Sequence, residues 1–142
     1  MAVEHSAKAT WNGDLMGGAG TFSLGSAAGT EVGITWRARA EDASAGTSPE
    51  ELIAAALAGC FSMALSHGLA QAGTPATRLD TEATASFQGG VGITGIALRV
   101  RGEVPGTDEG TFRQAAETAK ENCPVSKALK GNVEITLDAA LA

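Results

Sequence analysis

The sequence lacks the features that mark several common classes of protein. It has 142 residues and a formal net charge of −6, and its ten lysine and arginine residues form no run. The phosphate backbone of a nucleic acid would therefore find little positive charge to bind. A chain of this length can bury a hydrophobic core without disulfides or a metal. We expect a single domain over residues 1–142, with no nucleic acid partner.

Two further signals are missing. The first eight residues contain neither the basic segment nor the apolar segment of a secretory signal, which predicts a cytoplasmic location. Thiols in the cytoplasm stay reduced unless they are catalytic or sensing. The glycine-rich stretch 17–20 lies in an expected hairpin and opens no helix, so it does not predict a phosphate-binding loop.

Residues 52–77 contain no charged residue, and the stretch is long enough to cross a bilayer. Its composition argues against a membrane span, because small residues are frequent and the polar Ser62, Ser66 and His67 interrupt it. The residues at its entrance are acidic, not basic. We expect a helix buried at the centre of the domain and no membrane partner.

The first half of the chain predicts three strands and a long helix. Strands are expected at 7–11, 17–24 and 31–39, and residues 41–47 form a polar connector. Ser48 is the expected N-cap, Pro49 takes the first helical position, and Glu51 stands where a capping box requires an acid. The helix is expected to run to about residue 72 and to end at Gly73.

The second half predicts two more strands, at 79–87 and 93–101, joined by a glycine turn. Helical spacing of apolar residues follows over 109–122, and Pro124 ends that helix near Cys123. A helical turn at 125–129 and a strand at 133–137 complete the chain. The fold class predicted is α+β.

The chain has two cysteines, and their settings differ. Cys60 lies deep in the small-residue helix, whereas Cys123 stands just before a proline. Free cysteines are often simply buried, and two can form a static disulfide. The expected reducing compartment disfavours the static disulfide, so we interpret the two thiols as a redox pair.

Three motifs in this order resemble the osmotically inducible protein C family, which includes the organic hydroperoxide resistance proteins. They are Gly46-Thr47-Ser48-Pro49-Glu50-Glu51-Leu52-Ile53, Ala58-Gly59-Cys60-Phe61-Ser62-Met63-Ala64-Leu65 and Asn122-Cys123-Pro124-Val125-Ser126. The segments 11–14 and 133–138 are similar to further landmarks of the family. The residues after Cys60 resemble the osmotically induced branch more than the other.

The resemblance implies an intertwined homodimer, in which two long helices lie between antiparallel sheets and the active sites lie at the dimer interface. It implies a stress-response antioxidant enzyme, a peroxidase that reduces organic hydroperoxides to alcohols. No bound cofactor is implied. The reductant it implies is a dithiol, commonly a dihydrolipoyl group on a partner protein.

The chemistry of the residues agrees with this resemblance. A peroxide needs a thiolate to attack its distal oxygen, and Cys60 would supply it. The resulting sulfenic acid condenses with a second thiol, which would be Cys123. A buried thiol needs a nearby cation to lower its pKa, and that cation must be oriented. The resemblance places these roles on Arg39 and Glu50, and the apolar residues around Cys60 would favour an organic hydroperoxide over hydrogen peroxide.

Neighbouring residues compete for two of these roles. Arg37 lies two residues before Arg39, and on a strand both would share one face. In the family, the arginine is followed by an aromatic residue and an acidic residue. The run from Arg39 to Asp42 resembles this pattern, which favours Arg39. Glu51 is explained by the capping box, whereas Glu50 has no comparable local duty.

A zinc site built from Cys60, His67 and Cys123 would be the sharpest rival chemistry. Seven helical residues separate Cys60 from His67 by about 10 Å, too far for both to bind one ion. We therefore expect no metal. The second hypothesis for function is a redox-switched binding or sensing protein for an apolar ligand, which would use the same two thiols without turnover.

Overall fold

A computed structural model describes residues 2–27 and 29–142 of the chain. The chain divides into two compact units, the first ending at Leu52 and the second beginning at Ile53. We describe each unit by itself. The expectation of a single domain over residues 1–142 stays a prediction.

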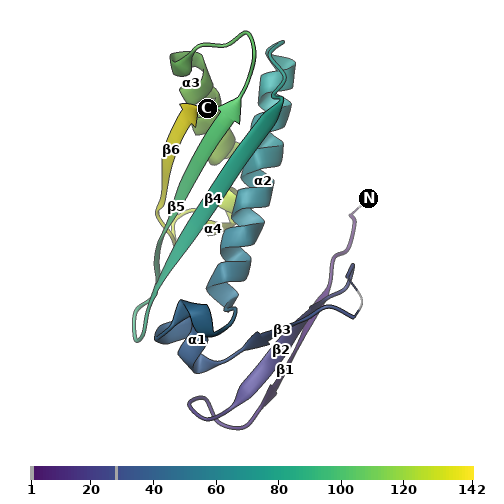
Figure 1. Cartoon of the computed structure of the whole chain (residues 1–142), viewed down its shortest axis with the longest axis vertical. Coiled ribbons are helices and arrows are strands. Elements are labelled where there is room, and N and C mark those ends of the chain that lie inside the picture. The colour runs from purple at the N-terminus through teal and green to yellow at the C-terminus, as the bar shows by residue number, and fades with distance from the viewer. Residues whose placement is uncertain (1, 28) are drawn as a thin grey trace. The chain divides into compact units, whose positions relative to one another are not determined.

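The first unit contains a small antiparallel sheet. Its strands are β1 (Ala7–Asn12), β2 (Ala19–Leu24) and β3 (Glu31–Ile34), which pair in that order (Figure 1). A short helix α1 (Trp36–Ala40) and a 3-10 turn (Ala43–Ala45) follow. Among the described residues of this unit only Ala38 and Glu50 are buried. The sheet therefore encloses almost no core of its own.

The expectation of one strand over 31–39 is wrong at its C-terminal end. Strand β3 stops at Ile34, and Thr35 caps α1 by accepting a hydrogen bond from the backbone N–H of Ala38 at 3.1 Å. Alanine and arginine, which dominate the next five residues, favour helix over strand. The two arginines, Arg37 and Arg39, thus lie on a helix and not on one face of a strand.

The long helix α2 (Pro49–Gln71) begins and ends where the sequence predicts. The Ser48 hydroxyl oxygen accepts from the backbone N–H of Glu51 at 3.1 Å, which is half of the predicted capping box. The Glu51 carboxylate accepts from the hydroxyl of Thr47 at 2.6 Å. At the other end Gly73 adopts a φ of 83°, the left-handed conformation that ends many helices.

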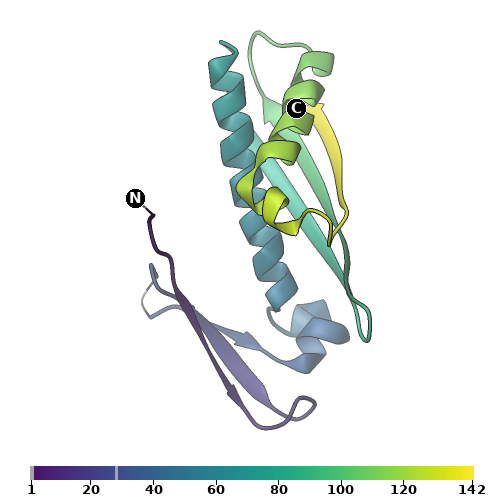
Figure 2. The ribbon, with the colours of Figure 1, turned by 180° about the vertical axis from the view of Figure 1, so that it is seen from behind.

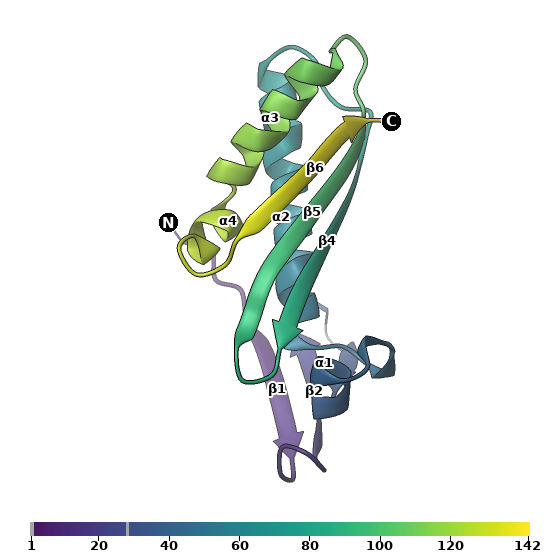
Figure 3. The same ribbon diagram turned by 90° about the vertical axis from the view of Figure 1, so that its left-hand side faces the viewer.

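The second unit pairs a mixed sheet with helices. Its strands are β4 (Arg78–Gln88), β5 (Gly92–Glu103) and β6 (Ile135–Leu141), in the order β4-β5-β6 (Figure 3). Strands β4 and β5 form the predicted hairpin. Strand β6 runs parallel to β5, which departs from the expectation of purely antiparallel sheets. The reason is the connection through α3 (Glu109–Asn122) and α4 (Pro124–Leu129), since a crossover of this length returns the chain in the same direction.

Helices α2 and α3 cover the same face of this sheet (Figures 2 and 3). The side chains of β4 alternate strictly between exposed and half-buried, so the other face of the sheet is solvated. Between helices and sheet lies one hydrophobic core. Its fully or nearly fully buried members come from α2, β5 and α3 and the residues just beyond them: Leu57, Phe61, Leu65, Leu69, Ile96, Leu98, Val100, Val104, Phe112, Ala116, Ala119 and Cys123.

By length and composition, α2 is the one helix of the described chain that could cross a membrane. Core helices of soluble proteins meet the same test, and the large side chains on one side of α2 pack in the core of the second unit. The expectation that α2 is buried all round is wrong for the single chain. Ala55, Ala56 and Gly59 are exposed, and Met63 keeps 76% of its surface exposed.

Gly102 of β5 gives a test of the packing between sheet and helix. A Cβ atom at this position would lie 2.6 Å from Cζ of the fully buried Phe112. We expect Gly102→Ala to lower the free energy of unfolding by about 2 kcal/mol, because Phe112 cannot move aside in a filled core. Urea unfolding followed by circular dichroism measures the change.

Gly95→Ala is the matched control, since it lies on the same strand and its nearest neighbour, the carbonyl oxygen of Glu134, is 3.6 Å from the added carbon. It should change the unfolding free energy by less than about 1 kcal/mol. Equal effects of the two substitutions would contradict the packing described.

Candidate active site

The second unit brings the two predicted thiols into contact. Cys60 lies on α2 and is half-buried, whereas Cys123 lies between α3 and α4 and is fully buried. Both are free thiols, and a hydrogen bond joins their side chains. The two thiols are therefore neighbours within the second unit.

Pro124 sets the position of Cys123. Because proline lacks a backbone N–H, α3 ends at Asn122, and the backbone N–H of Cys123 bonds to the carbonyl of Ala119 at 2.9 Å. Pro124 then opens α4, for which Cys123 is the N-cap residue. The Cys123 sulfur is thus held at a turn between two helices, at the start of α4.

The two thiols have opposite pKa shifts. Burial raises the pKa of Cys60, and the hydrogen bond with Cys123 raises it further. Burial also acts to raise the pKa of Cys123, but the backbone N–H of Ser126, the Cys60 thiol and the Ser126 hydroxyl bring it below its ordinary value. Within residues 53–142 the sulfur that deprotonates more readily is therefore that of Cys123. A cation close to Cys60 would act in the opposite direction and lower the pKa of this thiol.

Arg39 and Glu50 form a close ion pair in the first unit. The Nε atom of Arg39 donates to both carboxylate oxygens of Glu50 at 3.1 and 3.2 Å, and its Nη2 atom donates to Oε1 at 2.8 Å. Glu50 is 4% exposed, whereas the Arg39 side chain keeps 36% of its surface accessible. The buried carboxylate therefore holds a partly exposed guanidinium in one orientation.

Arg37 has a different partner. Its Nη2 atom lies 3.1 Å from Oδ2 of Asp42, and its side chain is 69% exposed. Two residues of helix turn the chain by about 200°, so Arg37 and Arg39 point to different sides of α1. The interpretation that both arginines share one face is thus corrected, and only one of them meets a buried carboxylate.

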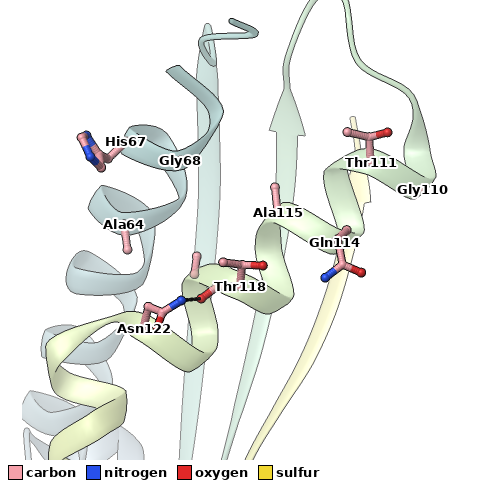
Figure 4. A pocket seen from close by; sticks show the side chains of 10 residues that line it. Ala64, His67, Gly68, Gly110, Thr111, Gln114, Ala115, Thr118 and Asn122 are labelled. Carbon is pink, nitrogen blue, oxygen red and sulfur yellow. Dashed lines mark hydrogen bonds between the residues drawn. The ribbon is translucent and has the colours of Figure 1, made fainter. Parts of the chain in front are cut away.

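Sequence reasoning missed a groove between α2 and α3, which Figure 4 shows from close by. It has a volume of about 720 Å³, and mostly small or polar side chains line it. Ala64, His67 and Gly68 belong to α2, and Thr111, Ala115 and Asn122 are among those from α3. The repeated small residues at helical spacing are the signal that could have found it, because they keep the two helices from filling the space between them.

His67 is exposed and lines this groove; it makes no part of the contact between the thiols (Figure 4). Within residues 2–27 and 29–142, no three side chains of histidine, cysteine, aspartate or glutamate are grouped to hold a metal ion. Sequence reasoning also gave no role to Ser126, although it quoted the motif that contains it. This side chain is 6% exposed and lies beside Cys123.

Comparison with known proteins places this geometry in a family. Residues 40–138 match the model of the OsmC-like proteins. The chain is 44% identical over 141 residues to the peroxiredoxin OsmC of Escherichia coli, which covers 97% of this chain and 96% of that protein. It is 33% identical over 116 residues to the organic hydroperoxide resistance protein OhrA of Bacillus subtilis, with 78% and 79% covered.

Solved structures agree with the fold. An OsmC-like protein from Mycoplasma pneumoniae superimposes with a TM-score of 0.75 at 18% identity, covering 100% of this chain and 99% of that one. The organic hydroperoxide resistance protein OhrB of Bacillus subtilis gives a TM-score of 0.67 at 26% identity, with 94% and 97% covered. The predicted α+β class and the predicted resemblance are confirmed, and the chain belongs to the OsmC-like family.

Proposed function

We propose that this protein is a thiol-dependent peroxidase that reduces organic hydroperoxides to alcohols. The observation that carries the proposal is the contact between the Cys60 and Cys123 thiols, one half-buried and one fully buried. Two relatives support it by name, as a peroxiredoxin and as an organic hydroperoxide resistance protein.

The proposed cycle uses both thiols. The Cys60 thiolate attacks the distal oxygen of the hydroperoxide, so that the O–O bond breaks, the alcohol leaves after protonation, and Cys60 becomes a sulfenic acid. The Cys123 thiol then attacks the Cys60 sulfur, releasing water and forming a disulfide. A dithiol, for which we propose a dihydrolipoyl group on a partner protein, reduces the disulfide. No bound cofactor takes part, and we propose that the cycle runs in the cytoplasm.

Arg39 is the proposed cation for Cys60, and Glu50 the residue that orients it. The buried carboxylate of Glu50 fixes the guanidinium by three hydrogen bonds, while part of the arginine surface stays open to a substrate or a thiolate. A fixed cation beside a thiolate lowers the pKa of the thiol, since it favours the charged form.

The spacing of Glu50 and Cys60 implies that a second subunit completes the site. Ten residues of α-helix rise about 15 Å, which is farther than a carboxylate and the arginine that it orients can both span toward a thiol. We propose that Arg39 and Glu50 of one subunit serve the Cys60 of the other in a homodimer. The exposed small residues of α2 and the coreless sheet of the first unit offer surfaces for such an assembly.

Substitution of each cysteine separates the two thiol roles. We expect Cys60→Ser to abolish consumption of cumene hydroperoxide, including the first turnover, because the nucleophile is gone. Cys123→Ser should keep the first oxidation and leave a sulfenic acid, detected with dimedone by mass spectrometry. Loss of that first oxidation in Cys123→Ser would reverse the two roles.

With excess dithiol the unmodified protein should turn over many times, whereas a redox switch would be oxidised once and stop.

Matched substitutions of the two arginines test the proposed cation. In a Cys123→Ser background, Arg39→Gln should slow alkylation of Cys60 by iodoacetamide at pH 7 by about tenfold or more, since loss of a nearby cation raises the pKa of a thiol by about one unit or more. Arg37→Gln should change the rate less than about twofold, because its pair is exposed. A slower reaction in Arg37→Gln alone would assign the role to Arg37.

Mixed dimers test whether the two subunits share a site. Arg39→Gln and Cys60→Ser proteins should each be nearly inactive alone. After unfolding and refolding together, the heterodimers contain one site with both Arg39 and Cys60 intact if the site is shared, so peroxidase activity should return to about a quarter of the unmodified value. A site within one subunit predicts no recovery, because each subunit then lacks one of the two residues.

A further inference from the structure

The loop that carries Arg39 has almost no hydrophobic core to hold its shape. It begins at Gly33 and closes at Thr47, whose backbone N–H donates to the carbonyl of Gly33 at 3.2 Å. Of residues 33–47, all of which the structure describes, Ala38 alone is buried. Helix α1 within this loop has five residues, and a helix so short is not stable by itself. Polar contacts must therefore hold the loop in its conformation.

Asp42 makes contacts on both sides of the middle of this loop. Its Oδ1 atom accepts from the backbone N–H of Ser44 at 3.1 Å and from the Ser44 hydroxyl at 2.6 Å, which caps the 3-10 turn. Its Oδ2 atom lies 3.1 Å from Nη2 of Arg37 on α1. Its backbone N–H donates to the carbonyl of Arg37 at 2.8 Å. One residue thus ties the end of α1 to the turn that follows it.

The ion pair of Arg39 and Glu50 depends on this tie because its two members lie on either side of the turn. Arg39 belongs to α1, whose end Asp42 fixes, and Glu50 belongs to the first turn of α2. The three hydrogen bonds between the guanidinium and the carboxylate need a defined orientation of both groups. If the turn between them opened, α1 could rotate and these hydrogen bonds would be lost.

We propose that Asp42 is a positioning residue, which holds the loop so that the guanidinium of Arg39 meets the carboxylate of Glu50. The hydrogen bonds from Ser44 carry this role, because the pair of Asp42 with Arg37 is exposed and exposed pairs contribute little. The meaning of this role for catalysis rests on the proposed function, in which the same guanidinium serves the attacking thiol. The role within the loop can be tested without any activity.

Exchange of the Arg39 Nε–H proton with water measures how often the ion pair opens. Nuclear magnetic resonance of isotope-labelled protein records this rate, and loss of the signal in Arg39→Gln assigns it. We expect Asp42→Ala to raise the rate about fivefold, the typical effect of losing one N-cap on the equilibrium that it stabilises. Asp42→Asn keeps a capping oxygen and should stay within about twofold of the unmodified rate. An unchanged rate in Asp42→Ala would overturn the proposal.

The turn between β1 and β2 provides a matched control in the same unit. There the Asp14 carboxylate accepts from the backbone N–H of Gly17 at 2.7 Å, and the Trp11 indole N–H donates to a backbone carbonyl of the turn at 3.1 Å. Asp14→Ala should raise exchange of the Trp11 indole proton and leave that of Arg39 unchanged. Asp42→Ala should do the reverse. A rise in both rates after Asp42→Ala would indicate general loosening of the unit, which is a merely structural role, and would overturn the proposal.

Alkylation of Cys60 in a Cys123→Ser background connects the loop to the proposed chemistry. Slowing by Asp42→Ala should disappear when Arg39→Gln is also present, since a positioning residue acts only through the guanidinium that it places. Slowing that persists without Arg39 would overturn the proposal. An unaffected alkylation rate in Arg39→Gln itself would instead refute the proposed cation, and the exchange rates would still decide the role of Asp42.

Discussion

The contact of α2 with the sheet of the second unit fixes the position of everything else in that unit. Leu57, Phe61, Leu65 and Leu69 recur at every fourth position, and each is 1% exposed or less. Residues at this spacing form one stripe along a helix. Cys60 stands one residue before Phe61, so it lies at the border of the stripe. That position explains how the Cys60 thiol can lie beside a buried cysteine and still keep part of its surface accessible.

A second constraint acts in the first unit, where a carboxylate is buried. Removing Glu50 from water costs free energy unless a cation and hydrogen bonds compensate, and Arg39 supplies both. Loss of either partner would leave a charge unpaired. The pair consequently contributes to the fold of the connector before α2 as well as to the proposed chemistry, and substitutions of Arg39 need a check of folding beside the kinetic measurement.

Periodicity and end signals predicted most of the secondary structure. The bounds of α2 and α3 followed from Pro49, Gly73 and Pro124, residues whose backbone restrictions act locally. Two errors came from tertiary effects. The stretch after Ile34 has aromatic and β-branched neighbours typical of a strand, but the cap at Thr35 turns it into α1. The direction of β6 depends on where α3 packs, which no local pattern encodes.

The candidate site could be predicted only in part, because local motifs reveal some of its residues and tertiary packing decides the others. The motifs identified the cysteines and the glutamate, but the roles that the resemblance implies for them remain proposals. The choice between Arg37 and Arg39 could not be made from spacing, because it depends on a helix that was read as a strand. The surroundings of Cys123 could not be predicted either, since only the fold shows that Cys123 and Ser126 are both buried.

The contact between the thiols also bears on how the protein would survive an excess of its own substrate. A sulfenic acid has two fates, condensation with a thiol or irreversible oxidation by a second peroxide molecule. In the proposed cycle, the Cys123 and Cys60 side chains are already neighbours in the reduced state, so condensation requires no unfolding of the end of α3. Irreversible oxidation of the cysteine would then increase only slowly with peroxide concentration. This behaviour would suit an enzyme that works at high peroxide concentrations more than a sensor of low ones.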